Sequence, residues 1–255
     1  MQDQLPTFIS SLQTIPFGTA FGYLFVLTLF TAFNWGLEAF KWKQLTFHLQ
    51  PLSFKAAYAA ILTGQAVSFS SINRVGESIG KSMLLSDGNR LKGVVLSFVA
   101  SASQLLVTLL FGLIAVIWMY PSLHLQLQLQ LQLSEVVLSG FYGALFFLVG
   151  LFILCYIAIP FFANKLSKAP FFYRYAYLLA SIQTLPKHLL LQLALVSGAR
   201  YLVFLLQYLL IFKLCGVRID APTLMALTAI LFLILAIIPT LTLAELGIRG
   251  KVSLF

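Results

Sequence analysis

The chain has 255 residues, of which 60% are hydrophobic and 9% are charged. Its mean hydropathy of +0.97 means more apolar side chain than one soluble core can hide, which excludes a water-soluble globular protein. Sixteen Lys and Arg against seven Asp and Glu give a net charge of +9, but no motif that reads RNA or DNA accompanies it, so we expect anionic lipid headgroups, not nucleic acid, as the partner of this charge.

Four apolar runs are long enough to cross a membrane. A helix needs about 20 residues to span the hydrocarbon core, and runs of that length occupy residues 17–40, 93–120, 136–162 and 189–214. We therefore predict an all-α integral membrane protein, a polytopic helical bundle that forms a single membrane domain over residues 1–255.

Two further segments are apolar at first and then break. Residues 53–92 begin as a helix-like run and dissolve into a polar, glycine-rich stretch, and residues 221–251 are apolar as far as Ile238 and are then interrupted by Pro239. A proline at that place stops a helix, and irregular backbone at membrane depth needs protein or water to cover it. Both segments are predicted to be re-entrant or broken helices.

The two broken segments resemble each other. Glu77 follows Glu38 by 39 residues, Glu245 follows Gln207 by 38, and the breaks close on the similar phrases ESIGK and ELGIRGK. This spacing indicates an internal duplication. The first repeat would cover residues 17–162 and the second residues 189–255, and the second copy would be truncated, because two spans follow the first break and none follows the second.

The distribution of basic residues orients the two copies. Loops rich in Lys and Arg stay in the cytoplasm, which places residues 41–92 and 165–187 inside and residues 121–135, without Lys or Arg, outside. The copies then run in opposite directions, as in the inverted repeats of alternating-access carriers. Contact with headgroups is the expected role of Lys41, Lys43, Lys55, Arg90 and Lys92.

Ionisable side chains within membrane segments usually face a partner or water. We expect Arg74, Glu77 and Lys81 to line a cavity entered from the cytoplasm. A matching cavity entered from outside would be lined by Glu245, Arg249 and Lys251. The alternative is that Glu77 only pairs with a neighbouring cation and holds the re-entrant fold. The remaining candidates lie in the spans and are Glu38, Gln104, Arg200 and Gln207. The alternative for the two glutamines is that they only bridge neighbouring helices.

Motifs for catalysis are missing from the sequence. The stretch GESIGKS has three residues between its first glycine and the GK pair, whereas the phosphate-binding loop has four. His48, His124 and His188 are scattered without metal-ligand spacing, and no arrangement of Ser, His and Asp suggests a hydrolase. We expect a protein that is not an enzyme and that needs no metal or cofactor.

The candidate residues resemble a known family in their order and spacing. Asn34, Glu38 and Trp42 end the first span, Gly64 precedes the first break with its Arg74-x-Gly76-Glu77, and Pro239 precedes Gly247-Ile248-Arg249 in the second. Over residues 34–250 the chain resembles the transmembrane, flippase-like domain of the lysylphosphatidylglycerol synthases, and its stand-alone members without the synthase part. The later spans add Gln104, Arg200-Tyr201 and Gln207-Tyr208.

The resemblance implies lipid handling. It predicts that the protein moves a phospholipid or a lipid-linked headgroup between the leaflets of the bacterial inner membrane, with nine of the candidate residues, all except Lys251, in substrate binding. The alternative is a scaffold that transports nothing and serves as accessory subunit of an enzyme of envelope lipid or glycan synthesis.

Overall fold

The computed structural model describes residues 16–68, 75–124, 134–170, 175–217 and 219–237. Throughout these ranges the regular secondary structure is helical, which confirms the prediction of an all-α protein. Three of the nine candidate site residues lie outside the described ranges, namely Arg74, Glu245 and Arg249, and so does Lys251.

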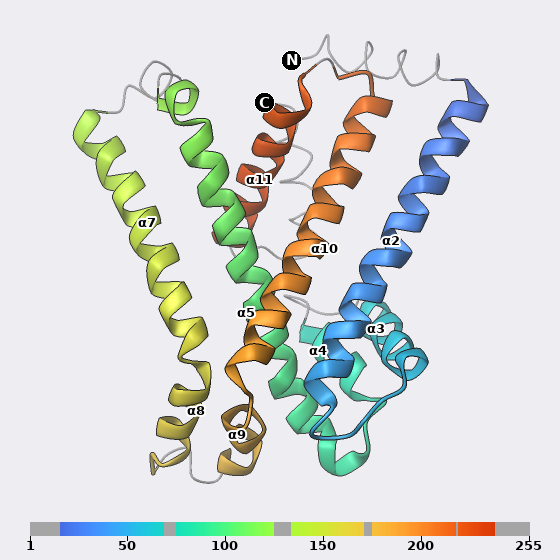
Figure 1. Cartoon of the computed structure of the whole chain (residues 1–255), viewed down its shortest axis with the longest axis vertical. Helices are drawn as coiled ribbons and strands as arrows, with labels where there is room; N and C mark the ends of the chain where they lie inside the picture. Colours follow the sequence, from blue (N-terminus) through green and yellow to red (C-terminus); the bar gives the residue numbers. More distant parts are fainter. Residues whose placement is uncertain (1–15, 69–74, 125–133, 171–174, 218, 238–255) are drawn as a thin grey trace.

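Four helices are long and apolar enough to cross a membrane, in agreement with the four predicted spans. In Figure 1 each runs between the same two ends of the molecule. We call the end at which the first of them finishes the lower end, and the opposite one the upper end. The four helices are α2 (Phe17–Thr46), α5 (Asp87–Trp118), α7 (Glu135–Ile157) and α10 (Lys187–Leu214).

Several bounds differ from the prediction; α5, for example, begins six residues before the predicted residue 93, at Asp87. Two of the differences have a clear physical reason. Helix α2 continues six residues past the predicted end at Phe40, because its last turns are buried in the protein and include Trp42, Leu45 and Thr46. The third apolar run stops at Ile157, and a new helix, α8 (Ile159–Ser167), begins with Pro160 in its first turn. Proline is tolerated there because the first N–H groups of a helix lack helical acceptors.

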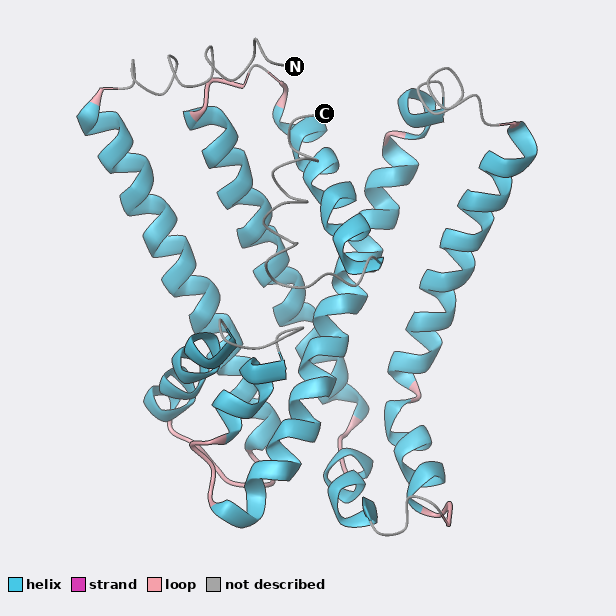
Figure 2. Cartoon of the chain, turned by 180° about the vertical axis from the view of Figure 1, so that it is seen from behind, coloured by secondary structure: helices cyan, strands magenta, loops and turns pink. Residues whose placement is uncertain are grey.

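Helix α5 lies at the centre of the bundle. It packs against α2, α7 and α10, and against three of the shorter helices, as the views from the front and from behind show (Figures 1 and 2). Helix α7 lies at the outside and, among the long helices, packs on α5. Near the lower end α8 packs on α9 (Ala176–Gln183).

A tight pair of short helices fills the lower end beside α2. Helices α3 (Phe54–Ser68) and α4 (Val75–Ser82) pack closely on each other, and both remain in the lower part of the molecule (Figure 1). Their backbones nearly touch, since a Cβ added to Gly80 would lie 2.8 Å from the Cα of Gly64. The polar stretch VGESIGKS, predicted to be irregular, is helical in α4.

Another short helix starts from the opposite end. Helix α11 (Ala221–Ile237) follows Asp220, whose carboxylate accepts the backbone N–H of Thr223 at 3.0 Å; this hydrogen bond lowers the pKa of Asp220. Seventeen residues at about 1.5 Å each fall short of the hydrocarbon thickness, and α11 stays in the upper part of the bundle (Figure 1). It packs on α5, where an added Cβ at Gly112 would lie 2.7 Å from Leu233.

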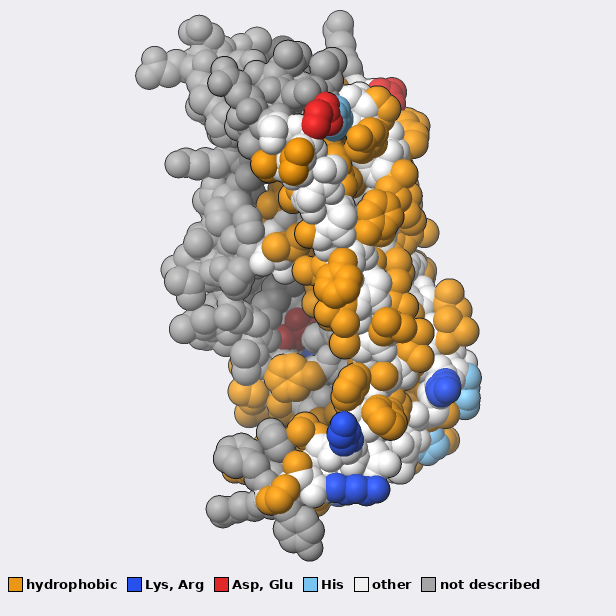
Figure 3. All heavy atoms as spheres, turned by 90° about the vertical axis from the view of Figure 1, so that its left-hand side faces the viewer, with side chains coloured by type: hydrophobic (Ala, Val, Ile, Leu, Met, Phe, Trp, Pro, Cys, Tyr) orange, Lys and Arg blue, Asp and Glu red, His pale blue; other side chains and the backbone are white. Residues whose placement is uncertain are grey.

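The surface has an apolar middle and polar ends. On the part of the face that is not grey, Figure 3 shows hydrophobic side chains along most of its length and Lys and Arg near its lower end. Asp and Glu are seen near its upper end and, recessed, at mid-height. A membrane protein is expected to show such an apolar band between charged ends. The exposed basic residues of the lower-end helix termini include Lys55, Arg90, Lys165, Lys168 and Lys187.

Candidate binding site around Glu38

One carboxylate lies at the centre of three cations inside the bundle. Glu38 of α2 is 3% exposed. Its Oε1 lies 3.0 Å from Nζ of Lys81 on α4, and its Oε2 lies 3.5 Å from Nζ of Lys41, one turn along α2. The same Oε2 is in direct contact with Nη1 of Arg200 on α10. Helices that are far apart in sequence are thus joined through a single side chain.

The helical period explains how α2 presents this carboxylate. Asn34, Glu38, Lys41 and Trp42 are spaced by four, three and one residues, which places them on one face of the helix. All four are buried, whereas Phe40 between them is exposed. The lower part of α2 therefore directs its polar groups into the protein, on a face that it shares with the ring of Trp42.

Arg200 is held in position by two other helices. Its Nε donates to Oδ1 of Asn34 at 3.0 Å, and Nδ2 of Asn34 donates back to the carbonyl oxygen of Arg200 at 3.2 Å. Its Nη1 also lies 3.4 Å from Oε1 of Gln104 on α5. The planar guanidinium suits such simultaneous contacts. With 12% of its side chain exposed, Arg200 is the most accessible of the three cations.

Lys81 connects the buried carboxylate to a more accessible one. Its Nζ lies 2.9 Å from Oε1 of Glu77, one turn earlier on α4, and 5.8 Å from the centre of the Trp42 ring. The side chain of Lys81 is 2% exposed and that of Glu77 is 21% exposed. Glu77 therefore forms the outer side of the cluster.

Lys41 lies on the inner side, among hydroxyl groups. Its Nζ donates to Oγ of Ser197 at 2.7 Å and to the carbonyl oxygen of Ala100 at 3.2 Å. The hydroxyls of Ser197 and Ser103 are 2.9 Å apart, and both serines are fully buried. Small hydroxyl residues allow close approach of membrane helices and bridge them by hydrogen bonds, so this seam ties α2, α5 and α10 together.

Two buried polar groups beside the cluster lack partners within the described part of the chain. They are the indole N–H of Trp42 and the hydroxyl of Tyr201, and each residue is 1% exposed. Tyr201 follows Arg200 on α10, and its ring lies 4.8 Å from that of Phe111. A buried donor without an acceptor is costly and calls for an explanation.

The structure brings together five of the nine predicted site residues. Gln207 lies apart from them, and its Nε2 donates to Oγ1 of Thr31 at 2.9 Å, which is the helix-bridging contact left open as an alternative. Arg74, Glu245 and Arg249 lie outside the described residues. The five that meet are Glu38, Glu77, Lys81, Gln104 and Arg200.

One basic residue is placed differently from the prediction. Lys41 was expected to contact headgroups, but it is 1% exposed and paired with Glu38. The signal in the sequence was its spacing, since a residue three positions after Glu38 lies on the same face of a helix. The serines at 103 and 197 carry no such signal, because a serine in a span is common and its partner is distant in sequence.

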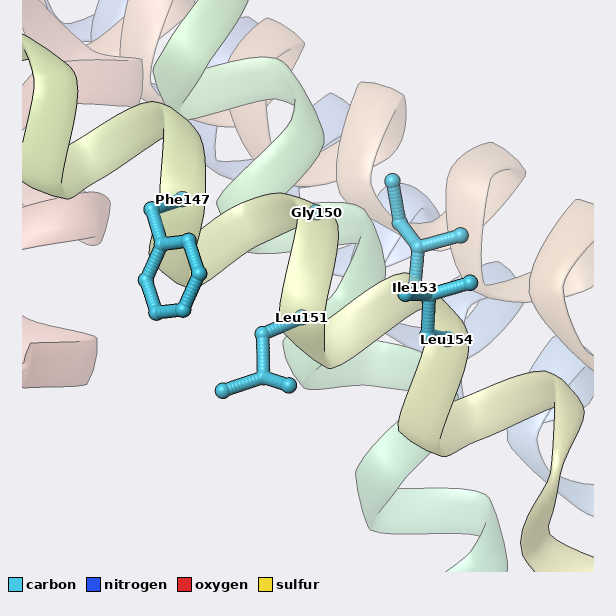
Figure 4. Close-up of a pocket in the computed structure, with 5 residues that line it drawn as sticks. All are labelled: Phe147, Gly150, Leu151, Ile153 and Leu154. Atoms are coloured by element: carbon cyan, nitrogen blue, oxygen red, sulfur yellow. The ribbon is translucent and has the colours of Figure 1, made fainter.

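Two hollows on the described surface lie away from the cluster and are lined mainly by apolar groups. One of about 470 Å³ lies on the outer face of α7, where Figure 4 shows Phe147, Leu151 and Leu154 beside Gly150. Such an apolar hollow makes only van der Waals contacts, of the kind that lipid acyl chains also make with one another. Among the described residues no group of three or more His, Cys, Asp or Glu could hold a metal ion.

Comparison of the chain with models of protein families, with curated proteins and with solved structures gives no match. The cluster itself is a set of hydrogen-bond donors and positive charges around two carboxylates. Such a set can bind a group rich in acceptor oxygens or hold helices together by ion pairs.

Proposed function

We propose that this membrane protein moves lipids with polar headgroups between the two leaflets, and that the cluster around Glu38 binds the headgroup. The observation that carries the proposal is the cluster itself, with three cations and two carboxylates inside an otherwise apolar bundle. Charges within the membrane are costly and usually mark the path of a substrate or an ion.

The short helices support a path that opens alternately to the two sides. Helices α3 and α4 occupy the lower part of the bundle and α11 the upper part (Figure 1). In carriers built from inverted repeats, interrupted helices enter from opposite sides and meet at the substrate site. Under this proposal α3 and α4 form the re-entrant segment of the first repeat, and α11 begins that of the second.

The resemblance to the flippase-like domain of the lysylphosphatidylglycerol synthases is part of the same proposal. The cluster supports it because Asn34, Glu38, Gln104 and Arg200, which carry the resemblance in sequence, meet in space. By the positive-inside rule the lower end would face the cytoplasm of a bacterial inner membrane. The lipid would enter the cluster from the side of Glu77 and Arg200.

Transfer of a fluorescent lipid in liposomes tests this function. Protein is reconstituted with a lipid whose fluorophore can be bleached from outside, and the bleached fraction reports exchange between leaflets. We expect wild-type protein to accelerate exchange and Arg200→Gln to slow it at least about tenfold, because one charged hydrogen bond to the headgroup is lost.

The matched control changes the same charge on the same helix. Lys213 is exposed near the upper end of α10, and Lys213→Gln should leave the exchange rate unchanged. Both variants must elute as monodisperse protein in detergent. Equal rates for wild type and Arg200→Gln would rule out the cluster as headgroup site.

A scaffold without transport is the second candidate. It is favoured by the internal pairing of the cluster, since each of its three cations contacts Glu38, and ion pairs of this kind can serve structure alone. A scaffold predicts that wild-type protein leaves lipid exchange at the rate of protein-free liposomes, and that an envelope-synthesis enzyme is recovered with it after crosslinking in the membrane.

A further inference from the structure

The charges of the cluster do not cancel. Counted over the described residues, Lys41, Lys81 and Arg200 supply three positive charges, and Glu38 and Glu77 supply two negative ones. The fully ionised cluster therefore carries one excess positive charge. A net charge away from water is expensive unless a partner neutralises it.

The excess charge lies where a ligand can reach it. Lys41 is enclosed by Glu38, Ser197 and the backbone of Ala100. Lys81 contacts two carboxylates, those of Glu38 and Glu77. Arg200 contacts only the carboxylate of Glu38, which both lysines also contact, and its other partners are neutral amides. Lys41 likewise contacts only one carboxylate, at 3.5 Å, and otherwise neutral groups. The excess charge therefore belongs to Lys41 and Arg200, and of these two cations Arg200 is the accessible one, with 12% of its side chain exposed.

A donor without an acceptor lies on the same buried face of α2 as Glu38. The indole N–H of Trp42 finds no partner among the described residues, and its ring lies next to Nζ of Lys81. A ligand with one negative charge would neutralise the excess charge, and several acceptor oxygens on it would match the donors of the cluster. A phosphodiester has these properties, because one charge is shared by two oxygens that match the guanidinium fork.

We propose that the cluster selects lipid headgroups by net charge and binds a phosphodiester lipid with one net negative charge in preference to zwitterionic and dianionic lipids. The inference rests on the proposed function for the location of the site. It adds that Glu77 and Gln104 set the preference, since both face the cations and each can be changed in charge without a change in shape.

Two isosteric substitutions move the net charge in opposite directions. Glu77→Gln raises the cluster to two excess positive charges, and Gln104→Glu lowers it to none. The double variant returns to one. The matched controls make the same changes at exposed positions outside the cluster, with Asp87→Asn at the start of α5 and Gln192→Glu on α10.

Equilibrium binding of short-chain lipids to the detergent-solubilised full chain measures the preference at pH 7. The probes are phosphatidylcholine without net charge, phosphatidylglycerol with one negative charge, and phosphatidic acid, whose phosphomonoester carries about two. Glycerophosphoglycerol, which lacks acyl chains, distinguishes a lipid site from a site for free phosphodiesters. Near-equal affinity for it and for phosphatidylglycerol would contradict a lipid site.

We expect wild-type protein to bind phosphatidylglycerol at least about tenfold more tightly than either other lipid, because one buried charge is matched or mismatched. Glu77→Gln should shift the preference about tenfold toward phosphatidic acid, and Gln104→Glu should abolish the preference for phosphatidylglycerol over phosphatidylcholine. The double variant and both controls should remain within about threefold of wild type, since exposed charges are screened.

Three results would overturn the inference: wild-type protein that binds the three lipids equally, single variants that shift the preference in the same direction, and a double variant that does not recover it. Lipid exchange decides the proposed function separately. Preferences that follow the charge in a protein that exchanges no lipid would retain this site and reject the transport.

Discussion

The two halves of α2 differ in which side chains are exposed and which are buried. Between residues 17 and 33 no side chain is buried, and rings such as Phe21, Phe25 and Phe33 are exposed. From Asn34 to Thr46 seven residues are buried, among them Glu38 and Lys41. In a water-soluble protein we would expect the phenylalanines to be buried and the charged residues to be exposed. In a membrane the phenylalanines can face outward, because lipid tails solvate an aromatic ring as well as a protein core does.

The comparison teaches what holds this bundle together. Where lipid is the solvent, burial of apolar side chains contributes little free energy to helix association. Polar contacts and close backbone packing therefore supply most of it. The lower part of α2 has both, since ion pairs reach α4 and α10 and small residues pack near them. Helix α7 illustrates the other case, since its buried residues Leu138, Leu145 and Val149 are apolar. The fourth, Tyr156, donates its hydroxyl to the carbonyl oxygen of Leu190 on α10 at 2.8 Å.

The largest effect is expected for Glu38→Gln. The substitution leaves Lys41, Lys81 and Arg200 without their common carboxylate, and removal of one partner from a buried ion pair costs about 3–5 kcal/mol. We expect the free energy of unfolding in mixed micelles to fall by that amount as the denaturing detergent is increased.

Asp87→Asn is the control for this change. It removes a carboxylate from an exposed ion pair with Arg90, in which the side chains are 51% and 88% exposed, and should cost less than about 1 kcal/mol. An equal loss of stability in the two variants would mean that the buried cluster contributes nothing particular.

An intermediate effect is expected for Gly80→Ala. The added Cβ would lie 2.8 Å from the Cα of Gly64 and 2.9 Å from the carbonyl oxygen of Thr63, and backbone atoms cannot move aside as a side-chain tip can. Overpacking of this kind costs about 1–3 kcal/mol, measured by the same unfolding titration.

Gly88→Ala serves as the comparison, because an added Cβ there meets nothing within 4 Å. The extra methyl group in the first turn of α5 should leave stability unchanged or raise it by up to about 1 kcal/mol. If Gly80→Ala were as stable as Gly88→Ala, the close approach of α3 and α4 would be disproved.

The smallest effect is expected in the upper half of α2. Phe25 is 57% exposed, and its ring contacts lipid in the folded protein and in the membrane-embedded unfolded chain alike. Phe25→Ala should change the free energy of unfolding by less than about 0.5 kcal/mol. A loss as large as that caused by Glu38→Gln would show that this half of the helix is covered by protein after all.

The spans could be predicted from the sequence and the cluster only in part. Each span is a continuous apolar run, so its length alone identifies it. Helix α4 was not predicted, because glycine and serine lower helix propensity, whereas tertiary contacts hold VGESIGKS in a helix. Glu38, Glu77 and Arg200 drew attention as charges in or near apolar segments. Their meeting could not be predicted, since Glu38 and Arg200 are separated by 162 residues.

Lys41 shows why exposure is hard to infer near the end of a span. A lysine there usually extends to the headgroups, and composition does not distinguish that case from an inward one. The decisive fact is which face of α2 is covered by α5 and α10, where Ala100 and Ser197 accept its hydrogen bonds. That is a property of tertiary packing.

The near contact between Gly64 and Gly80 also limits how the molecule can move. Two helices whose main chains touch cannot slide past each other without a clash. Any displacement must therefore carry α3 and α4 together, with the bending concentrated in the joints at residues 47–53 and 83–86. The two helices would then rotate as one rigid unit about these joints, and the Lys81–Glu38 ion pair would have to break before they could move away from α2.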